Sequence, residues 1–228
     1  VASRHPPVAR ARGLCEDGIG KTRRIGSVPM ADFAERRRIM VDTQVRPSDV
    51  TSFPIIDAML SVPREGFVPD AVRDLAYVGG PVALTTTRQL MEPRTIAKML
   101  QALDVTPADL VLEIGPGLGY GTALLARLAE AVVAVEEDPS LAAEAEAALS
   151  AHGADNAAVL TAPLTLGSAR NGPYDVIVVF GGVEEMPQAL IDQLKEGGRI
   201  MAVFMDAALG EARLGRKHQG VVSWRMEF

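Results

Sequence analysis

The chain has 228 residues, a length that suits one well-buried domain and is short for two. Apolar residues make up 48% of the chain and charged residues 23%, and the net charge of -6 argues against a nucleic-acid binder that works by neutralising phosphates. No run of 18 apolar residues occurs, so we expect no membrane span, and the single cysteine excludes an intramolecular disulfide and fits a reducing cytoplasm.

Residues 1–29 differ in character from the rest of the chain. They are basic and are interrupted by Gly and Pro, without a helical or strand period. We expect a disordered or non-native N-terminal extension here, with the natural start at Met30 and a single domain over residues 30–228. A targeting peptide and a disordered regulatory arm are the alternatives for the extension.

Three helices are predicted between this extension and residue 105. They span residues 32–45, 48–61 and 93–103. Pro47 stops the first helix and Pro63 ends the second, whose cap is Ser48 or Thr51. Residues 62–92 between the second and third helices are irregular and rich in Pro, Gly and Thr, and residues 76–92 are expected to form part of a substrate pocket.

From residue 109 onward, short apolar runs alternate with helical stretches. The runs predict strands at 110–114, 132–135, 157–160, 175–179 and 199–204. Helices are predicted at 122–130, 139–151 and 187–194, the last closed by Gly197-Gly198. Residues 211–227 predict two strands joined around 218–220. The expected fold is therefore α/β: a Rossmann-like, mostly parallel, doubly wound sheet with an antiparallel C-terminal hairpin and N-terminal helices.

A Gly-rich turn follows the first of these strands, where the strand gives way to a helix. Glu113, Gly115, Gly117 and Gly119 form the pattern E-x-G-x-G-x-G. A dinucleotide site would need a third glycine at position 120, which is Tyr120. An acid before the turn would repel a pyrophosphate, but it suits a cationic amino or sulfonium group. The pattern therefore favours S-adenosylmethionine as the cofactor.

Glu136 ends the next predicted strand and supports the same cofactor. A carboxylate at this place can accept hydrogen bonds from both ribose hydroxyls of a nucleoside. A plain tight turn with a solvated strand end would explain one glycine, but not three alternate glycines between two acids. We therefore expect residues 106–228 to form a cofactor-binding core, and residues 30–105 to form a helical, substrate-side part.

Three segments of the chain resemble the protein-L-isoaspartate O-methyltransferases, a family of methyltransferases. VLEIGPGLGYGTALLARL within residues 107–128 is similar to the family's first motif, and residues 173–203 are similar to its later strand–helix–strand block. VPREGFVPD at residues 62–70 is similar to its V-P-R-x-x-F-V-P segment. The resemblance implies that Tyr120 and Phe180 join the two acids and three glycines in binding S-adenosylmethionine. It also implies carboxyl methylation of isoaspartyl proteins or peptides, a repair reaction.

Two segments depart from the family pattern. The family's I-S-Q-P is here Leu90-Met91-Glu92-Pro93, which makes Met91 and Glu92 the substrate-side candidates. A hydroxyl is lost there, and a negative charge is added where a carboxylate should approach. The family's G-D-G, whose acid contacts adenine, is here Ala162-Pro163-Leu164. The alternatives are a diverged methyltransferase for another carboxylate or a small molecule, and a non-catalytic relative that binds a nucleoside or a protein.

Other titratable residues give no further site. His5, His152 and His218 are far apart in the sequence, without acids or cysteine at ligand spacing, so no metal is expected. Glu184 and Glu185 are expected to cap the helix that follows them rather than to touch substrate. A carboxylate acceptor is already a nucleophile at pH 7, which agrees with the lack of a His–Asp or Cys–His pair in the sequence.

Overall fold

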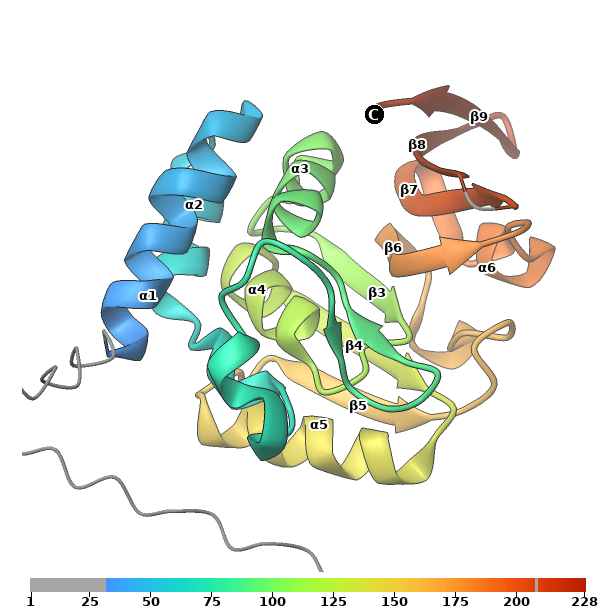
Figure 1. The fold of residues 1–228 in the computed structure, drawn as a ribbon. Coiled ribbons are helices and arrows are strands. Elements are labelled where there is room, and N and C mark those ends of the chain that lie inside the picture. Colours follow the sequence, from blue (N-terminus) through green and yellow to red (C-terminus); the bar gives the residue numbers. More distant parts are fainter. Residues whose placement is uncertain (1–31, 208) are drawn as a thin grey trace, which may run out of the picture. The chain divides into compact units, whose positions relative to one another are not determined.

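Short runs of Val, Leu and Ile build the seven-stranded sheet at the centre of the fold (Figure 1). The computed structural model describes residues 32–207 and 209–228. The strands of the sheet are β3 (Leu110–Ile114), β4 (Ala131–Glu136), β5 (Ala157–Thr161), β6 (Tyr174–Val183), β7 (Leu194–Asp206), β8 (Leu209–His218) and β9 (Val221–Met226). Their order is β5-β4-β3-β6-β7-β8-β9, with the first five parallel to one another and β8 antiparallel to both of its neighbours, β7 and β9. The predicted α/β class with an antiparallel C-terminal hairpin is confirmed.

Both faces of the sheet are covered, because alternate side chains of its central strands point to opposite sides. Val111 and Val176 belong to one apolar core, whereas Leu112 and Ile177 belong to the other. The first core is shared with the helices α3 (Pro93–Leu103), α4 (Tyr120–Leu128) and α5 (Pro139–Ala151). The second core includes Leu190 of α6 (Gln188–Asp192). The sheet is therefore doubly wound, as the sequence predicts.

The first predicted helix has the expected extent but a different geometry. The helix α1 (Phe33–Met40) begins at Asp32, whose carboxylate accepts the Glu35 N–H at 2.8 Å. It continues as a π-helical turn over Val41–Val45 and a 3-10 turn over Arg46–Ser48. The predicted end at Val45, before Pro47, is confirmed, and Pro47 lies in the first turn of the 3-10 segment, where its missing N–H leaves no hydrogen bond unmade. The chain turns away only at Asp49, in the left-handed conformation with φ 62°.

The second predicted helix begins later than expected. The helix α2 (Phe53–Ser61) has Ser52 as its N-cap, without a side-chain capping bond, so the predicted caps Ser48 and Thr51 are wrong. The backbone N–H groups of Thr51 and Ser52 instead donate to Gln101 Oε1 at 2.7 and 3.1 Å. These hydrogen bonds come from α3, far along the chain, and no local sequence pattern could reveal them.

Residues 62–92 contain short turns and one small hairpin. The turns are 3-10 segments at Arg64–Phe67 and Asp70–Leu75, and the hairpin pairs β1 (Val82–Ala83) with β2 (Gln89–Leu90). The fully buried Arg64 donates to the carbonyls of Ala76 at 2.7 Å and Met91 at 2.6 Å. This arginine therefore fixes the segment that follows the β1–β2 hairpin.

The last helix and the strand after it differ from the prediction. The helix α6 ends at Asp192, because Leu194 is drawn into the sheet and pairs with Tyr174. Gly197 and Gly198 lie within β7 and do not close the helix, which corrects the expectation. The predicted hairpin is present as β8 and β9, and the Trp224 ring packs 4.8 Å from the ring of Phe204.

Within the residues that the structure describes, no helix is long and apolar enough to cross a bilayer. The extension expected at residues 1–29 lies outside the described residues. The single domain over residues 30–228 stays a prediction.

Candidate active site

The Gly-rich turn lies where the strand order of the sheet reverses. The strand β3 lies between β4, which follows it directly, and β6, which the chain reaches only after β5. In open α/β sheets, ligands bind beyond the carboxyl ends of the strands at such a point. Gly115, Gly117 and Gly119 have φ of 70°, 58° and 91°, in the left-handed region that side chains disfavour. The turn therefore needs its three glycines for conformational reasons.

The three glycines differ in what lies beside them. Gly115 and Gly117 border the pockets described below, so they are placed to let a ligand approach the backbone. A Cβ on Gly119 would lie 3.3 Å from Leu149 Cγ of α5. Gly119 lines none of these pockets, and its small size lets α5 pack against the turn.

Glu113 is buried at the end of β3. With Gly117 and Phe180 it lines a small pocket of about 30 Å³, here called the Glu113 pocket. Burial raises the pKa of Glu113 to about 8; the hydrogen bond from Thr122 opposes this rise and the nearby charge of Glu136 adds to it. The carboxyl group therefore holds a proton at neutral pH, and a cationic ligand would favour its ionised form.

Two residues that sequence reasoning missed complete the surroundings of Glu113. The hydroxyl of Thr122 donates to Glu113 Oε2 at 2.5 Å. A Cβ on Gly121 would lie 2.6 Å from Cδ2 of Phe180 and would also collide with the Glu113 carboxylate. Their place directly after Tyr120, in the first turn of α4, is the signal that could have found them.

Glu136 is fully buried at the end of β4, and its carboxylate connects the Gly-rich turn with the residues that follow β4. Its Oε2 accepts the Gly117 N–H at 3.1 Å. Its Oε1 accepts the N–H groups of Glu137 at 2.9 Å and Asp138 at 3.3 Å. The carboxylate thus binds the Gly-rich turn to the start of α5, in addition to its predicted role toward ribose.

Arg88, in the β1–β2 hairpin, reaches across to these acids, and sequence reasoning missed it. Its Nη2 lies 3.3 Å from Glu136 Oε1 and 2.8 Å from Glu137 Oε1. From the same hairpin, Leu84 Cδ1 lies 2.7 Å from where a Cβ on Gly117 would stand. The β1–β2 hairpin therefore covers both the Gly-rich turn and the predicted ribose acceptor.

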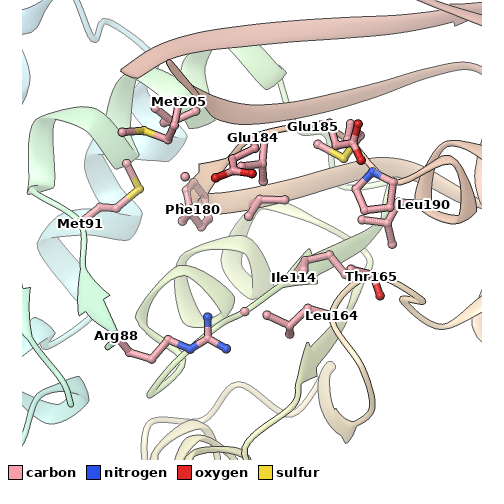
Figure 2. A pocket seen from close by; sticks show the side chains of 18 of the residues that line it. Arg88, Met91, Ile114, Leu164, Thr165, Phe180, Glu184, Glu185, Leu190 and Met205 are labelled. Atoms are coloured by element: carbon pink, nitrogen blue, oxygen red, sulfur yellow. The ribbon is translucent and has the colours of Figure 1, made fainter. Parts of the chain in front are cut away.

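A pocket of about 690 Å³, here called the large pocket, opens beside the carboxyl ends of β3 and β6 (Figure 2). This volume is in the range of small-molecule sites, roughly 300–1,000 Å³. Figure 2 shows Arg88 and Met91 on the side of the β1–β2 hairpin, and Glu184 and Glu185 beyond Phe180. The large pocket adjoins the Glu113 pocket, because Gly115 and Phe180 line both, as do three residues of the 87–91 segment, namely Arg88, Gln89 and Met91.

The two substrate-side candidates lie in different places. Met91 lines both pockets. Glu92 lines neither; it is the N-cap residue of α3, and its Oε1 accepts from Thr95 Oγ1 at 2.6 Å and from Arg94 Nε at 3.3 Å. The negative charge of Glu92, which the sequence analysis places near the acceptor carboxylate, therefore lies at the start of α3, outside both pockets.

The side chain of Tyr120 lies in the core, away from the pockets. It is fully buried, with the Arg64 guanidinium 4.8 Å from its ring centroid and the Phe67 ring at 5.9 Å. Tyr120 lines neither the large pocket nor the Glu113 pocket. Its side chain therefore packs the VPREGFVPD segment, which contains Arg64 and Phe67, against α4.

The segment that replaces the family's G-D-G borders the large pocket through Leu164. Thr165, the next residue, also lines this pocket and offers a hydroxyl. Glu184 and Glu185 line the pocket as well, whereas the N-cap of α6 is Pro187, without a side-chain capping bond. The expectation that these two acids cap the helix is therefore wrong, because β6 continues to Val183 and delays the helix.

Metal ligands do not gather at this site. Among the described residues, no group of three or more His, Cys, Asp or Glu side chains could hold a metal ion.

The arrangement of strand order, Gly-rich turn and two buried acids is that of an S-adenosylmethionine-dependent methyltransferase. The model of the family "Protein-L-isoaspartate(D-aspartate) O-methyltransferase" matches residues 36–224. A protein-L-isoaspartate O-methyltransferase of Methylorubrum extorquens is 38% identical over 187 residues, 80% of this chain and 79% of that relative. One of Syntrophus aciditrophicus is 40% identical over 172 residues, 75% of this chain and 79% of the relative. The chain belongs to the protein-L-isoaspartate O-methyltransferase family.

Solved structures show the same fold. A protein-L-isoaspartate O-methyltransferase structure superposes with a TM-score of 0.75 at 24% identity, covering 86% of this chain and 63% of that chain. A Plasmodium falciparum protein assigned to the same family, solved in complex with S-adenosyl-L-homocysteine, gives a TM-score of 0.73 at 18% identity. That match covers 86% of this chain and 94% of the other.

Proposed function

We propose that the protein methylates the free carboxyl group of isoaspartyl residues in proteins and peptides, with S-adenosylmethionine as the methyl donor. One observation carries the proposal. Glu113 and Glu136 end adjacent parallel strands on either side of a left-handed glycine turn, and a pocket of about 690 Å³ adjoins them. Such a site suits a nucleoside with a cationic tail and leaves room for an acceptor beside it.

The residues present fit the cofactor. Glu113, buried and with its pKa raised to about 8, would pair with the ammonium group. The backbone at Gly115 and Gly117 allows close approach, and Glu136 would accept the ribose hydroxyls. When bound, S-adenosylmethionine supplies a methyl group on a positively charged sulfur.

The large pocket would take the acceptor and keep water away from it. Met91, Phe180 and Met205 present apolar surface there. An isoaspartyl carboxylate is ionised at neutral pH and needs no general base, so the protein contributes alignment and the exclusion of water. The alignment of the carboxylate would therefore decide the rate.

The hydroxyl lost at Met91 has neighbours that could replace it. Thr87 and Gln89 line the large pocket and carry donors that suit a carboxylate. Glu92 does not face the pocket, so its charge does not oppose the acceptor there. We therefore infer that the two departures from the family pattern shift the acceptor contacts to the 87–89 segment without closing the site.

Methyl transfer to a matched pair of peptides tests the proposal. The purified chain is mixed with labelled S-adenosylmethionine and either an isoaspartyl peptide or the same peptide with ordinary aspartate. We expect label, in a base-labile ester, on the isoaspartyl peptide alone, and inhibition by S-adenosylhomocysteine. Cofactor binding without this transfer would point to another carboxylate as the acceptor. No binding of S-adenosylhomocysteine would favour a non-catalytic relative.

A further inference from the structure

Arg88 stands where three pockets meet. It borders the large pocket, the Glu113 pocket and a third of about 320 Å³, whose other lining residues are Thr85, Thr87, Glu137, Asp138 and Leu141. No other cationic side chain of the described residues lines any of the three. The guanidinium can therefore act on the nucleoside side and on the acceptor side of the site.

The Arg88 guanidinium also occupies the Glu136 carboxylate, which a ribose would need as its hydrogen-bond acceptor. The side chain of Glu136 is 0% exposed, and its Oε1 faces Arg88 Nη2 at 3.3 Å. The backbone N–H groups of Gly117 and Glu137 take up further acceptor positions of this carboxylate. Ribose hydroxyls and the guanidinium therefore compete for the same oxygen, and Arg88 must leave Glu136 before a nucleoside is held there.

The charges of the large pocket give the released guanidinium a second role. Glu184 and Glu185 are exposed at its rim, and both would repel an anionic acceptor. Arg88 is the one cation among the lining residues of this pocket, and its charge is balanced while it contacts Glu136 and Glu137. Once it is freed from Glu136, the Arg88 guanidinium offers two parallel N–H donors, whose geometry matches the two oxygens of a carboxylate.

We propose that Arg88 couples the two halves of the site. In the free protein it blocks the ribose acceptor Glu136, and with the nucleoside in place it binds the carboxylate of the acceptor. This inference rests on the proposed function, because it takes the acceptor to be a carboxylate. Arg88 is then a specificity-determining residue for anionic acceptors and a barrier to cofactor binding.

Calorimetric titration with S-adenosylhomocysteine tests the first half. The full chain is compared with Arg88→Gln and with Arg225→Gln, which removes an arginine of β9 that is 73% exposed and paired with Glu227. Arg88 is itself 30% exposed, so solvent screens its attraction to the buried Glu136, and we expect Arg88→Gln to bind about threefold to fivefold more tightly. Arg225→Gln should bind as the parent does, and thermal unfolding checks that each variant is folded.

Steady-state kinetics on an isoaspartyl peptide test the second half. Loss of a charge-assisted hydrogen bond should raise KM for the peptide about tenfold in Arg88→Gln, with kcat changed much less. Arg88→Lys keeps the charge on a different head group and should give an intermediate KM. A merely structural role would lower kcat and the melting temperature together, and lysine would not restore KM.

The outcomes separate this inference from the proposed function. Weaker binding of S-adenosylhomocysteine by Arg88→Gln would overturn the blocking role, and an unchanged peptide KM would overturn the acceptor role. Both results presuppose a parent chain that binds the nucleoside and methylates the peptide. Failure of the parent in either assay would instead overturn the proposed function.

Discussion

The proton on Glu113 should make cofactor binding depend on pH. Burial raises the pKa of this carboxyl group to about 8, so at pH 7 the free protein holds it mostly neutral. An ammonium group beside it favours the charged form, so binding should release a proton. Calorimetry of S-adenosylhomocysteine binding at pH 7, in buffers of different ionisation enthalpy, should show this release, and the affinity should rise from pH 6 to pH 8.

The variant Glu113→Gln is the control for this effect. It keeps an oxygen for the Thr122 hydroxyl but cannot ionise, so proton release and the pH dependence should disappear. A raised folded pKa means that the stabilising contribution of Glu113 is complete below about pH 4.5 and is lost as the pH rises through about 8. The difference in unfolding free energy between Glu113→Gln and the parent should therefore shift in favour of the variant at pH 9. Unchanged proton release in the variant would assign the proton to another group.

Gly121 should tolerate no side chain. A Cβ there would overlap the Glu113 carboxylate and lie 2.6 Å from Phe180 Cδ2. We expect Gly121→Ala to lower the unfolding free energy by about 1–3 kcal/mol, as overpacked sites do, and to weaken binding of S-adenosylhomocysteine. Urea unfolding and calorimetry measure the two effects. Gly80→Ala is a matched control for stability only, since nothing lies within 4 Å of its Cβ position and its backbone is not in the left-handed region.

For single residues, the sequence predicts the members of the site that lie in one strand and in the turn that follows it. Glu113 and the glycines could be predicted because their spacing is local, and Glu136 because it ends the next strand. The partners Arg88 and Leu84 could not be predicted, because they reach the site across the fold from a hairpin with no distinctive pattern. Burial of Tyr120 was also hidden, since its neighbours Arg64 and Phe67 precede it by more than fifty positions.

Among the elements, the link between α2 and α3 depends on one amide side chain. Gln101 accepts from the N–H groups of Thr51 and Ser52 and donates to the Asp49 carbonyl at 2.6 Å. Gln101→Ala should lower the unfolding free energy by about 1–2 kcal/mol, because three backbone groups before α2 lose their partner. Urea unfolding measures the loss. Thr51→Ala, which keeps the backbone N–H, should change little; an equal loss would mean that the Thr51 side chain caps the helix.

Elements whose boundaries are set by local chemistry agree best with the sequence. The strand β3 and the helix α5 have the predicted bounds, since α5 begins with Pro139 after the capping residue Asp138. The bounds of α2, α6 and β7 differ from the prediction because distant groups set them. Gln101 accepts a backbone N–H group just before α2, and the pairing of Leu194 with Tyr174 ends α6. The π-helical turn at Val41–Val45 has no sequence signal that we recognise.

For the whole molecule, ligand binding and stability should be linked. If the site holds S-adenosylhomocysteine, a concentration of 100 times Kd should add about 2.7 kcal/mol and raise the melting temperature by roughly 5–10 °C. Thermal unfolding at rising ligand concentration measures this. NAD is the control ligand and should give no shift, because Tyr120 stands where a dinucleotide turn needs a glycine. An equal shift with NAD would mean a general nucleotide site.

Glu136 serves the fold as well as the ligand. It accepts backbone N–H groups from the Gly-rich turn and from the residues just before α5, so the connections after β3 and β4 depend on it even when nothing is bound. Selection for a stable chain alone would keep this acid in a descendant that had lost the methyl donor. The Glu113 side chain accepts one hydrogen bond, from Thr122, and is costly to bury. Among diverged relatives, retention of the acid before the glycines is therefore the better marker of a working cofactor site.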